Sequence, residues 1–397
     1  MLTIVLVGAV PVFSQTTQGR RRTRSKSHRS RIRPNIPKPL VPVKPSVPKE
    51  LPIEIQARPE FLSRPLPKIR RLTKGRWAPS AVDALERVLE YTGEENPDYS
   101  PSDPPVVVIG FEDVAVNGHL GEAVFQRMVR KAAFRFNQPF WNRIPLQYGR
   151  ARIHAGYQGF RKMPEGMWPN DPYFRMYRKG MLRAYRSICE EAGIPACRRW
   201  IASLLMNYSE RDLRTFSRET LTEELNRPVG YETVGDTPED PNPERERTGI
   251  RLIPEMLELF TQLRLQGLDL WIMSTSNDWT ATVFAAPLGV HTSRVVGIRV
   301  KVVDGFLMEE PLIPTPTGSG AAEAMTLFVG RTPVLVIASP EDEALLGYGH
   351  GARVVIAKES LDAKKAREWR MRGWLIQRSF SPIRAPQRLP GSAPATP

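Results

Sequence analysis

The pattern of hydrophobic and polar positions separates a central part with regular elements from two flanks without them. From about residue 73, apolar residues at helical spacing alternate with short β-branched runs, which predicts a parallel sheet covered on both faces by helices. The clearest run is residues 106–109, which ends at Gly110 and precedes a helical pattern that starts near residue 121. Residues between such a strand and helix lie where open α/β sheets bind ligands.

The same alternation returns after residue 250. Asp304-Gly305 lies between two further apolar runs and predicts a hairpin turn. The segment 119–250 is instead helical and aromatic, with frequent prolines, which indicates an inserted helical domain. Further strands are expected at residues 268–273, 334–337, 353–356 and 374–377.

The two flanks have different compositions. Residues 1–14 are an apolar run too short to span a bilayer, and they suit a signal peptide of an exported protein, periplasmic or secreted. Because this run has no basic residue at its start, a cytoplasmic protein with an unusual N-terminus is the alternative. Residues 15–72 alternate basic residues with proline and predict a disordered linker, and the Pro-rich residues 381–397 predict a disordered tail. No other stretch is long and apolar enough for a transmembrane span.

The positive charge is concentrated at the N-terminus. The net charge is +15, but residues 1–49 contain 11 basic residues and no acidic one, which leaves +4 for residues 50–397. Residues 16–49 are therefore either a solvated linker or an arm that binds an acidic polymer or a membrane surface. We favour the linker, because residues 16–60 contain no aromatic side chain on which a nucleic-acid base would stack.

Charge is also uneven inside the helical segment. Residues 119–218 have 19 basic against 7 acidic residues, and residues 219–246 have 9 acidic against 2 basic. Two interpretations are open: a basic surface that concentrates anionic ligands, or helix faces paired with the acidic stretch. Cys189 and Cys197, eight residues apart, match no zinc-site spacing, so they either form a disulfide in an exported protein or are two buried thiols.

Residues 96–125 resemble the first motif of the haloacid dehalogenase (HAD) superfamily, in its phosphoserine-phosphatase-like branch. That motif has the form hhhDxDxT, where h is apolar, and some members continue into a segment similar to His119–Phe125 (HLGEAVF). The resemblance implies a HAD-like doubly wound parallel sheet, with a Rossmann-like core formed by residues 73–118 and 251–380. It also implies a helical cap domain inserted at residues 119–250.

The aspartates of this motif are replaced. The flanks align Gly110 with the nucleophilic Asp of the family, Glu112 with its acid/base Asp, and Val114 with its Thr. Family members transfer a phosphoryl group to the first Asp with the help of Mg²⁺. A shifted register would make Asp113 the nucleophile, but Ala115 would then replace the second carboxylate.

The three other motifs of the family are partly retained. Ser274 ends a predicted strand where the family binds phosphate through a Ser or Thr, so we take Ser274 and Thr275 as candidate phosphate-binding residues. In residues 318–324, Ala321 replaces the family's Lys. In residues 337–342, Asp342 remains as a vestigial metal ligand, and Ala338 replaces its partner. We therefore expect Mg²⁺, if it is the cofactor, to bind weakly or not at all.

These replacements favour a HAD-like protein that is catalytically silent or nearly so, a pseudophosphatase. It would bind an anionic or phosphorylated small molecule, or a protein partner. One alternative is an active phosphomonoester hydrolase with rearranged residues, which would use Glu112 or Asp113 with Asp342. Another is a basic arm that binds anions while the folded domain serves as its anchor.

Overall fold

The fold is built around a sheet of six parallel strands. The computed structural model describes residues 72–73, 75–358 and 361–388, so the predicted signal peptide, all but the last residue of the predicted linker, and residues 389–397 lie outside the described part. The strand order is β12-β11-β10-β1-β6-β7. The strands are β1 (Val106–Gly110), β6 (Asp269–Asn277), β7 (Val295–Ile298), β10 (Leu335–Ala338), β11 (Ala352–Ala357) and β12 (Leu375–Arg378).

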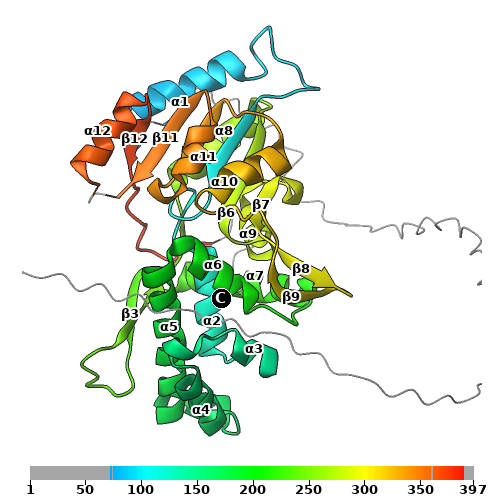
Figure 1. Cartoon of the computed structure of the whole chain (residues 1–397). Helices are drawn as coiled ribbons and strands as arrows, with labels where there is room; N and C mark the ends of the chain where they lie inside the picture. The colour runs from blue at the N-terminus through cyan, green and yellow to red at the C-terminus, as the bar shows by residue number, and fades with distance from the viewer. Residues whose placement is uncertain (1–71, 74, 359–360, 389–397) are drawn as a thin grey trace, which may run out of the picture. The chain divides into compact units, whose positions relative to one another are not determined.

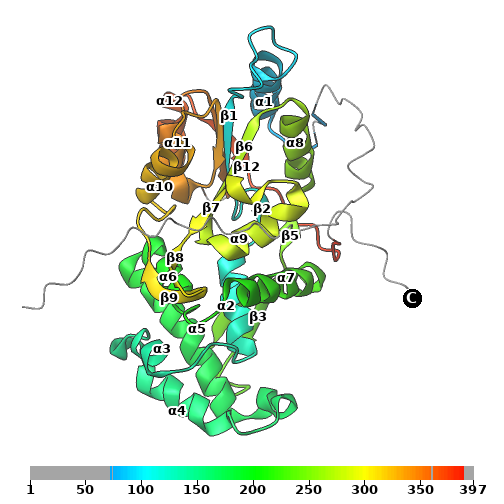
Figure 2. The ribbon, with the colours of Figure 1, turned by 90° about the vertical axis from the view of Figure 1, so that its right-hand side faces the viewer.

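Helices cover both faces of this sheet (Figures 1 and 2). Alternate residues of each strand point to opposite faces, so Val107 and Ile109 of β1 pack in one apolar cluster while Val106 and Val108 pack in another. The first cluster includes residues of α1 (Pro79–Thr92), α8 (Pro254–Leu265) and α9 (Asp278–Ala285). The second includes residues of α10 (Gly320–Ala324), α11 (Glu343–Tyr348) and α12 (Ala363–Met371). This is the doubly wound arrangement that the alternation predicts.

A helical domain is inserted between β1 and β6. It has its own apolar cluster, rich in aromatic side chains such as Phe140, Phe160 and Tyr177. The β8–β9 hairpin of the core (Val300–Val303 and Phe306–Pro311) packs against this cluster through Val300 and Leu307. The cap elements are α2 (Leu120–Arg130), α3 (Gln138–Asn142), α4 (Arg150–Phe160), α5 (Pro172–Ala192), α6 (Ile194–Ser203), α7 (Glu210–Asn226) and the antiparallel pair β3 (Gly230–Val234) and β4 (Glu244–Thr248).

The return from the cap to the core is held by Arg251. It lies in β5 (Arg251–Leu252), which pairs with β2 (Val116–Asn117), and its side chain is buried. Its guanidinium donates hydrogen bonds to backbone carbonyls of α7, of residue 250 and of residues 383–385. Gln387 adds hydrogen bonds to the backbone of Leu252. The first residues of the predicted disordered tail are therefore packed on the domain, at least as far as Gln387.

The length of β6 differs from the sequence-based expectation. Strand β6 continues to Asn277, whereas we expected it to end before Ser274. Among the described residues, no helix is both long and apolar enough to cross a bilayer.

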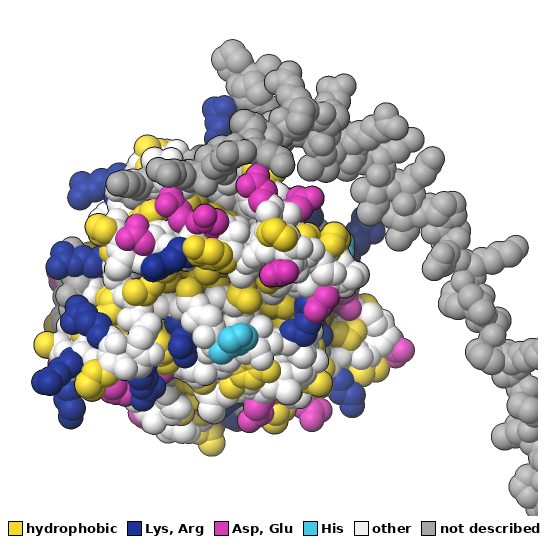
Figure 3. Space-filling model, turned by 90° about the horizontal axis from the view of Figure 1, so that it is seen from above, with side chains coloured by type: hydrophobic (Ala, Val, Ile, Leu, Met, Phe, Trp, Pro, Cys, Tyr) yellow, Lys and Arg dark blue, Asp and Glu magenta, His cyan; other side chains and the backbone are white. Residues whose placement is uncertain are grey.

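Seen from above, acidic and basic side chains both occur on the face shown in Figure 3, so this face has no field of a single sign.

Candidate functional site

Three of the four predicted motif positions meet at one edge of the sheet. Strand β1 is central and lies between β6 and β10, and all three are parallel. Gly110 is in register with Met273, the residue before Ser274, and Ile109 is in register with Ile337, the residue before Ala338. Residues 162 or more positions apart in the chain are thus brought to the same strand ends, as expected for parallel strands.

Glu112 is the most extensively bonded residue at these strand ends. Its side chain is buried, and Oε1 accepts hydrogen bonds from the hydroxyls of Ser274 and Ser276, both at 2.6 Å. Oε2 accepts from the backbone N–H of Thr275 at 2.9 Å and from its hydroxyl at 3.3 Å. The candidate phosphate-binding residues Ser274 and Thr275 therefore donate to the Glu112 carboxylate.

His119 extends this network into the cap. Its Nδ1 accepts a hydrogen bond from the backbone N–H of Glu122 and so caps α2, which places the ring proton on Nε2. Nε2 lies 2.9 Å from the hydroxyl of Thr275. Burial, with the nearby Arg198 and Arg247 guanidinium groups, holds the pKa of His119 well below its usual value. The ring is therefore neutral at physiological pH.

Asp342 lies beside this network with one close partner. Its Oδ2 accepts a hydrogen bond from the Ser339 hydroxyl at 3.0 Å. Burial, together with the Glu112 and Glu341 carboxylates, raises the pKa of Asp342 to about 7, although the Ser339 hydrogen bond acts in the opposite direction. The side chain is therefore a mixture of carboxyl and carboxylate near neutral pH.

The third motif position is placed apart from the network. Ala321 is buried in the apolar cluster that also contains Trp271 and Met273. Gly320, just before it, is required by packing, because a β-carbon there would lie 2.4 Å from the carbonyl oxygen of Thr315. The close contact with Thr315 thus explains why residue 320 is a glycine, at a position that the family pattern places near the phosphate.

Asp113 is held in a pair of ion contacts. It has a φ of +52°, a conformation that is uncommon for a residue other than glycine. Its carboxylate contacts the Arg247 guanidinium at 3.0 Å and the Lys358 ammonium at 3.7 Å. Burial alone would raise the pKa of Asp113, but Arg247, the backbone N–H of Gly118 and Lys358 together outweigh burial and lower it. Asp113 is therefore a carboxylate neutralised by two cations.

A cavity of about 590 Å³ lies over these strand ends, and cap residues line its other side. Glu112, His119, Thr275 and Asp342 line it from the core side and the first cap helix. The cap also supplies cationic and aromatic side chains that the sequence did not single out: Arg198, Tyr231, Arg245 and Arg247. One signal was present, since Glu244-Arg-Glu-Arg247 alternates charge at the two-residue period of a strand.

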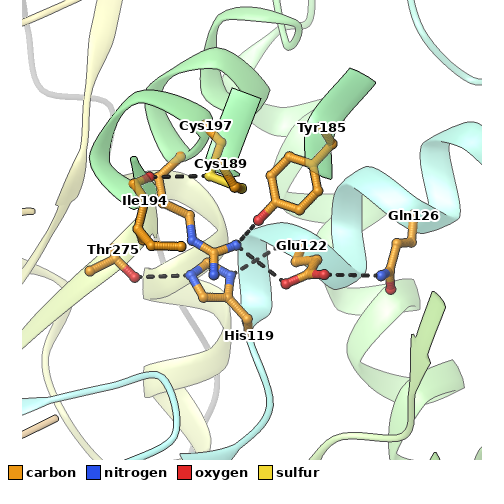
Figure 4. Close-up of a disulfide and its surroundings, with 9 residues drawn as sticks. His119, Glu122, Gln126, Tyr185, Cys189, Ile194, Cys197 and Thr275 are labelled. Carbon is orange, nitrogen blue, oxygen red and sulfur yellow. Dashed lines mark hydrogen bonds and ion pairs between the residues drawn. A yellow bond between two sulfur atoms is a disulfide. The ribbon is translucent and has the colours of Figure 1, made fainter. Parts of the chain in front are cut away.

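Arg198 connects the cavity to the cap disulfide. Its guanidinium contacts the hydroxyl of Tyr185 and lies 3.3 Å from the Glu122 carboxylate. Figure 4 shows Tyr185 and Glu122 beside the Cys189–Cys197 disulfide, which joins α5 to α6. The two cysteines, for which pairing and free thiols were both open, are thus bonded. Tyr185 is four residues before Cys189, and Arg198 directly follows Cys197.

Most of the charge in the cap is paired. Arg130 contacts Glu223, Glu224 and Glu246, and Arg186 contacts Glu244. These acidic residues come from the stretch 219–246, so the interpretation in which basic helix faces pair with that stretch is confirmed for them. Glu244 and Glu246 are buried on one face of β4, while Arg245 and Arg247 lie on its other face, toward the cavity.

Comparisons with known proteins agree with this architecture. No protein-family profile matches the chain, and no curated protein sequence does. A conserved protein of unknown function from Anaerococcus prevotii is similar in structure, with a TM-score of 0.67 and 19% identity over 77% of this chain and 93% of that one. The sheet, the inserted cap and the motif positions at adjacent strand ends are those that the resemblance implied. The fold is HAD-like, with an inserted helical cap.

Phosphatases are also among the similar structures, at lower similarity. A phosphoserine phosphohydrolase-like protein from Francisella tularensis has a TM-score of 0.35 and 14% identity, over 69% of this chain and 95% of that one. The structure of a phospho-aspartyl intermediate analogue of phosphoserine phosphatase has a TM-score of 0.33 and 11% identity, over 67% of this chain and 98% of that one. Structural similarity at this level carries no information about the activity of this chain.

The donor set at the strand ends does not fit the Mg²⁺ that HAD phosphatases use. Gly110 and Ala338 have no side-chain oxygen, and both oxygens of Glu112 already accept hydrogen bonds. Asp342 alone remains, whereas Mg²⁺ is usually held by more than one oxygen ligand with near-octahedral geometry. Within the described ranges, no three His, Cys, Asp or Glu residues form a group suited to a metal ion. Weak or absent Mg²⁺ binding stays a prediction.

Proposed function

We propose that this HAD-like protein is a pseudophosphatase, which binds an anionic or phosphorylated small molecule or a protein partner in the cavity under its cap without turning it over. The observation that carries the proposal is the position of the Glu112 carboxylate. It accepts hydrogen bonds from the hydroxyls of Ser274 and Ser276 and from the backbone N–H of Thr275. These donors would otherwise be free to bind a phosphoryl group. The residue at the acid/base position therefore acts as an internal ligand.

The chemistry of the fold supports the same conclusion. Phosphoryl transfer through an enzyme intermediate needs a nucleophile at the end of β1, and Gly110 has no side chain there. A general acid must reach the leaving oxygen, but both carboxylate oxygens of Glu112 are bonded to the end of β6. Gly110 therefore has no side chain to act as the nucleophile, and Glu112 is bonded to β6 and does not act as the general acid.

A binding role is supported by the cavity. A volume of about 590 Å³ suits a small organic molecule. Its lining includes Arg198, Arg245 and Arg247 from the cap and Lys358 from the core, which are the residue types that recognise carboxylates and phosphates. This charged lining supports the binding of an anionic ligand.

The alternative of an active hydrolase depends on Asp113 or Glu112 acting with Asp342. In the structure, Asp113 is neutralised by Arg247 and Lys358, and both oxygens of Glu112 accept hydrogen bonds. Neither carboxylate is free to attack phosphorus. An active enzyme would need both of these networks to rearrange when substrate binds, so we do not favour it.

Export is part of the proposal. The Cys189–Cys197 disulfide supports it, because disulfides persist in oxidising compartments and are rare in the cytosol. Residues 16–49, the candidate arm for acidic polymers or membrane surfaces, lie outside the described residues. Deleting that arm and measuring retention of the protein on an acidic polymer would show whether it contributes a separate activity.

The test of the proposal is hydrolysis of an aryl phosphate by the full-length protein, with and without Mg²⁺. A Glu112→Gln variant purified in parallel reports contaminating phosphatase, because the amide cannot act as an acid or base. We expect the two proteins to show the same background rate. A Mg²⁺-dependent rate that is present in the wild type and lost in the variant would establish an enzyme and overturn the proposal.

A further inference from the structure

The β8–β9 hairpin has an exposed apolar patch beside it. Among the described residues, thirteen large hydrophobic side chains are exposed, and six of them lie between residues 302 and 327, on the hairpin and on the segments that follow it. Apolar side chains gathered in this way are typical of a surface that another molecule covers. We call these six residues the hairpin patch: Val302, Val303, Phe306, Leu312, Ile313 and Leu327.

Contacts within the fold connect the two ends of the hairpin patch. Val303 is opposite Phe306 in the register of the hairpin. At the base of the hairpin, the backbone N–H of Leu312 donates to the carbonyl of Arg299. The Arg299 guanidinium lies 4.6 Å from the centre of the Phe328 ring, and Phe328 directly follows the last member of the patch. The patch therefore extends from the tip of the hairpin to its base.

Strand β8 is hydrogen-bonded on one side only. Its partner β9 is covered by the cap on its other side, because the N–H of Asn207 donates to the Leu307 carbonyl at 2.8 Å and the Leu307 N–H donates to the Tyr208 carbonyl at 2.9 Å. Within the described part of the chain, the backbone of residues 300–303 has no hydrogen-bond partner outside the hairpin. Figure 1 shows the hairpin projecting from the side of the molecule. The outer edge of β8 is thus available for pairing with another strand.

The charges around the patch argue against a bilayer as its partner. Residues 299–313 contain three acidic and two basic residues, and they contain no Trp or Tyr. Surfaces that dock on membranes instead surround their apolar residues with Lys and Arg, often together with interfacial aromatic side chains. A protein surface that supplies a second strand edge is the better match.

The size of the patch suits a second copy of this chain. From their exposed fractions, the six residues contribute about 500 Å² of accessible surface. Because about 65% of a homodimer interface is apolar, this area corresponds to about 800 Å² of interface on each partner. That is the area of a stable protein–protein interface.

We propose that the chain forms a two-fold symmetric dimer, in which the free edge of β8 pairs with β8 of a second copy in antiparallel orientation. The same surface then serves both partners, so one patch is sufficient. A two-fold axis at Val302 sets this residue opposite its own copy and Lys301 opposite Val303. An axis at Lys301 would instead set two lysines opposite each other, which is destabilising. The inference does not depend on the proposed function.

Sedimentation equilibrium of the full-length protein tests the dimer. We expect the wild type to have twice the mass of one chain at micromolar concentration. Val302→Asp should raise the dissociation constant of the dimer at least about tenfold, because two carboxylates would face each other at the axis. Met371→Asp is the matched control, since Met371 is 74% exposed on α12 and the change in net charge is the same. It should dimerise like the wild type, and thermal unfolding checks that both variants are folded.

A cysteine at the axis tests the register. The chain has two cysteines, and both belong to the Cys189–Cys197 disulfide, so an introduced cysteine supplies the only free thiol. Val302→Cys should form a disulfide-linked dimer under mild oxidation, because directly opposed residues of antiparallel strands lie within the Cα distance that a disulfide spans. Met371→Cys should remain a single chain at the same protein concentration.

Each of the following results would overturn the inference. A wild type with the mass of one chain at every concentration would show that there is no dimer. A dimer that Val302→Asp leaves intact would form through another surface, and equal cross-linking of the two cysteine variants would indicate random collision. If a monomeric wild type binds vesicles of phosphatidylcholine and phosphatidylglycerol and Val302→Asp does not, the patch is a lipid-docking surface and the dimer is excluded.

Discussion

At the scale of single residues, the site shows how a retained carboxylate can have a changed role. Glu112 is one methylene longer than the Asp of the family pattern, and its carboxylate reaches the hydroxyls of Ser274 and Ser276 on the neighbouring strand. Each of these hydrogen bonds to a charged acceptor stabilises the fold by about 1.5–3 kcal/mol when buried. The residue that the motif alignment places at the family's acid/base position thus joins β6 to the end of β1.

His119 gives a pH-dependent consequence of the same network. Its folded-state pKa lies below the unfolded value of 6.5, so the unfolded chain takes up a proton that the folded chain does not. Stability is therefore full above pH 6.5 and decreases as the pH falls below that value. Protonation of His119 in the unfolded chain should lower the free energy of unfolding between about pH 7.5 and about pH 5.5, by at most about 1.4 kcal/mol.

The measurement is urea unfolding of the wild type and a His119→Asn variant at both pH values. Asparagine keeps an acceptor that can cap α2 but does not titrate. The variant should lose less stability on acidification than the wild type, and the difference reports His119 alone, since other titrating groups are common to both. An identical pH dependence in the two proteins would mean that folding does not lower the pKa of His119, which would contradict this account.

At the scale of elements, the connection between α5 and α6 positions the cap side of the cavity. Tyr185 is on α5 and Arg198 is on α6, and the disulfide connects the two helices next to both residues. Strand β4 has a comparable role, because its alternation buries Glu244 and Glu246 against the cap helices and leaves Arg245 and Arg247 at the cavity. The elements that shape the site are thus fixed by covalent and ionic contacts on their other side.

Removing the disulfide should destabilise the connection between α5 and α6. The double variant Cys189→Ala, Cys197→Ala should lose about 2 kcal/mol of unfolding free energy, the value expected when a short loop is no longer closed. Urea unfolding with and without a thiol reductant measures it. The reductant should destabilise the wild type by a similar amount and leave the variant unchanged. Alkylation of two thiols in the untreated native protein would show that the cysteines are not paired.

At the scale of the whole molecule, the regular part of the fold is what the sequence predicts well. The β-branched run at residues 106–109 is the central strand, and the later apolar runs form the other strands because parallel strands are buried on both faces. Contacts between distant residues are not read from spacing. The pairing of Glu112 with β6 and of Asp113 with Arg247 joins residues more than 130 positions apart.

The candidate site was predictable in the same uneven way. The positions of Gly110, Ser274 and Ala338 follow from strand ends, and these meet as expected. Ala321 does not line the cavity, because its helix packs on the sheet face with Trp271. The cap residues Arg198 and Arg247 were missed, since the sequence of a cap helix or strand gives no local sign of which cavity it faces. Residues 383–387 were expected to be disordered because they belong to a Pro-rich tail, but Arg251 donates hydrogen bonds to the backbone carbonyls of Ile383 and Ala385.

The measurement that tests the central claim most directly is a calorimetric titration of Mg²⁺ into the full-length protein. A Gly110→Asp, Ala338→Asp double variant serves for comparison, since a β-carbon at Gly110 would lie 3.5 Å from its nearest neighbours and fits without displacement. The account predicts no saturable binding to the wild type at low-millimolar Mg²⁺, because Asp342 keeps a carboxylate at the family's metal positions while Gly110 and Ala338 do not. Saturable binding to the wild type that Glu112→Gln abolishes would contradict it, because Glu112 would then be a metal ligand and not an internal one.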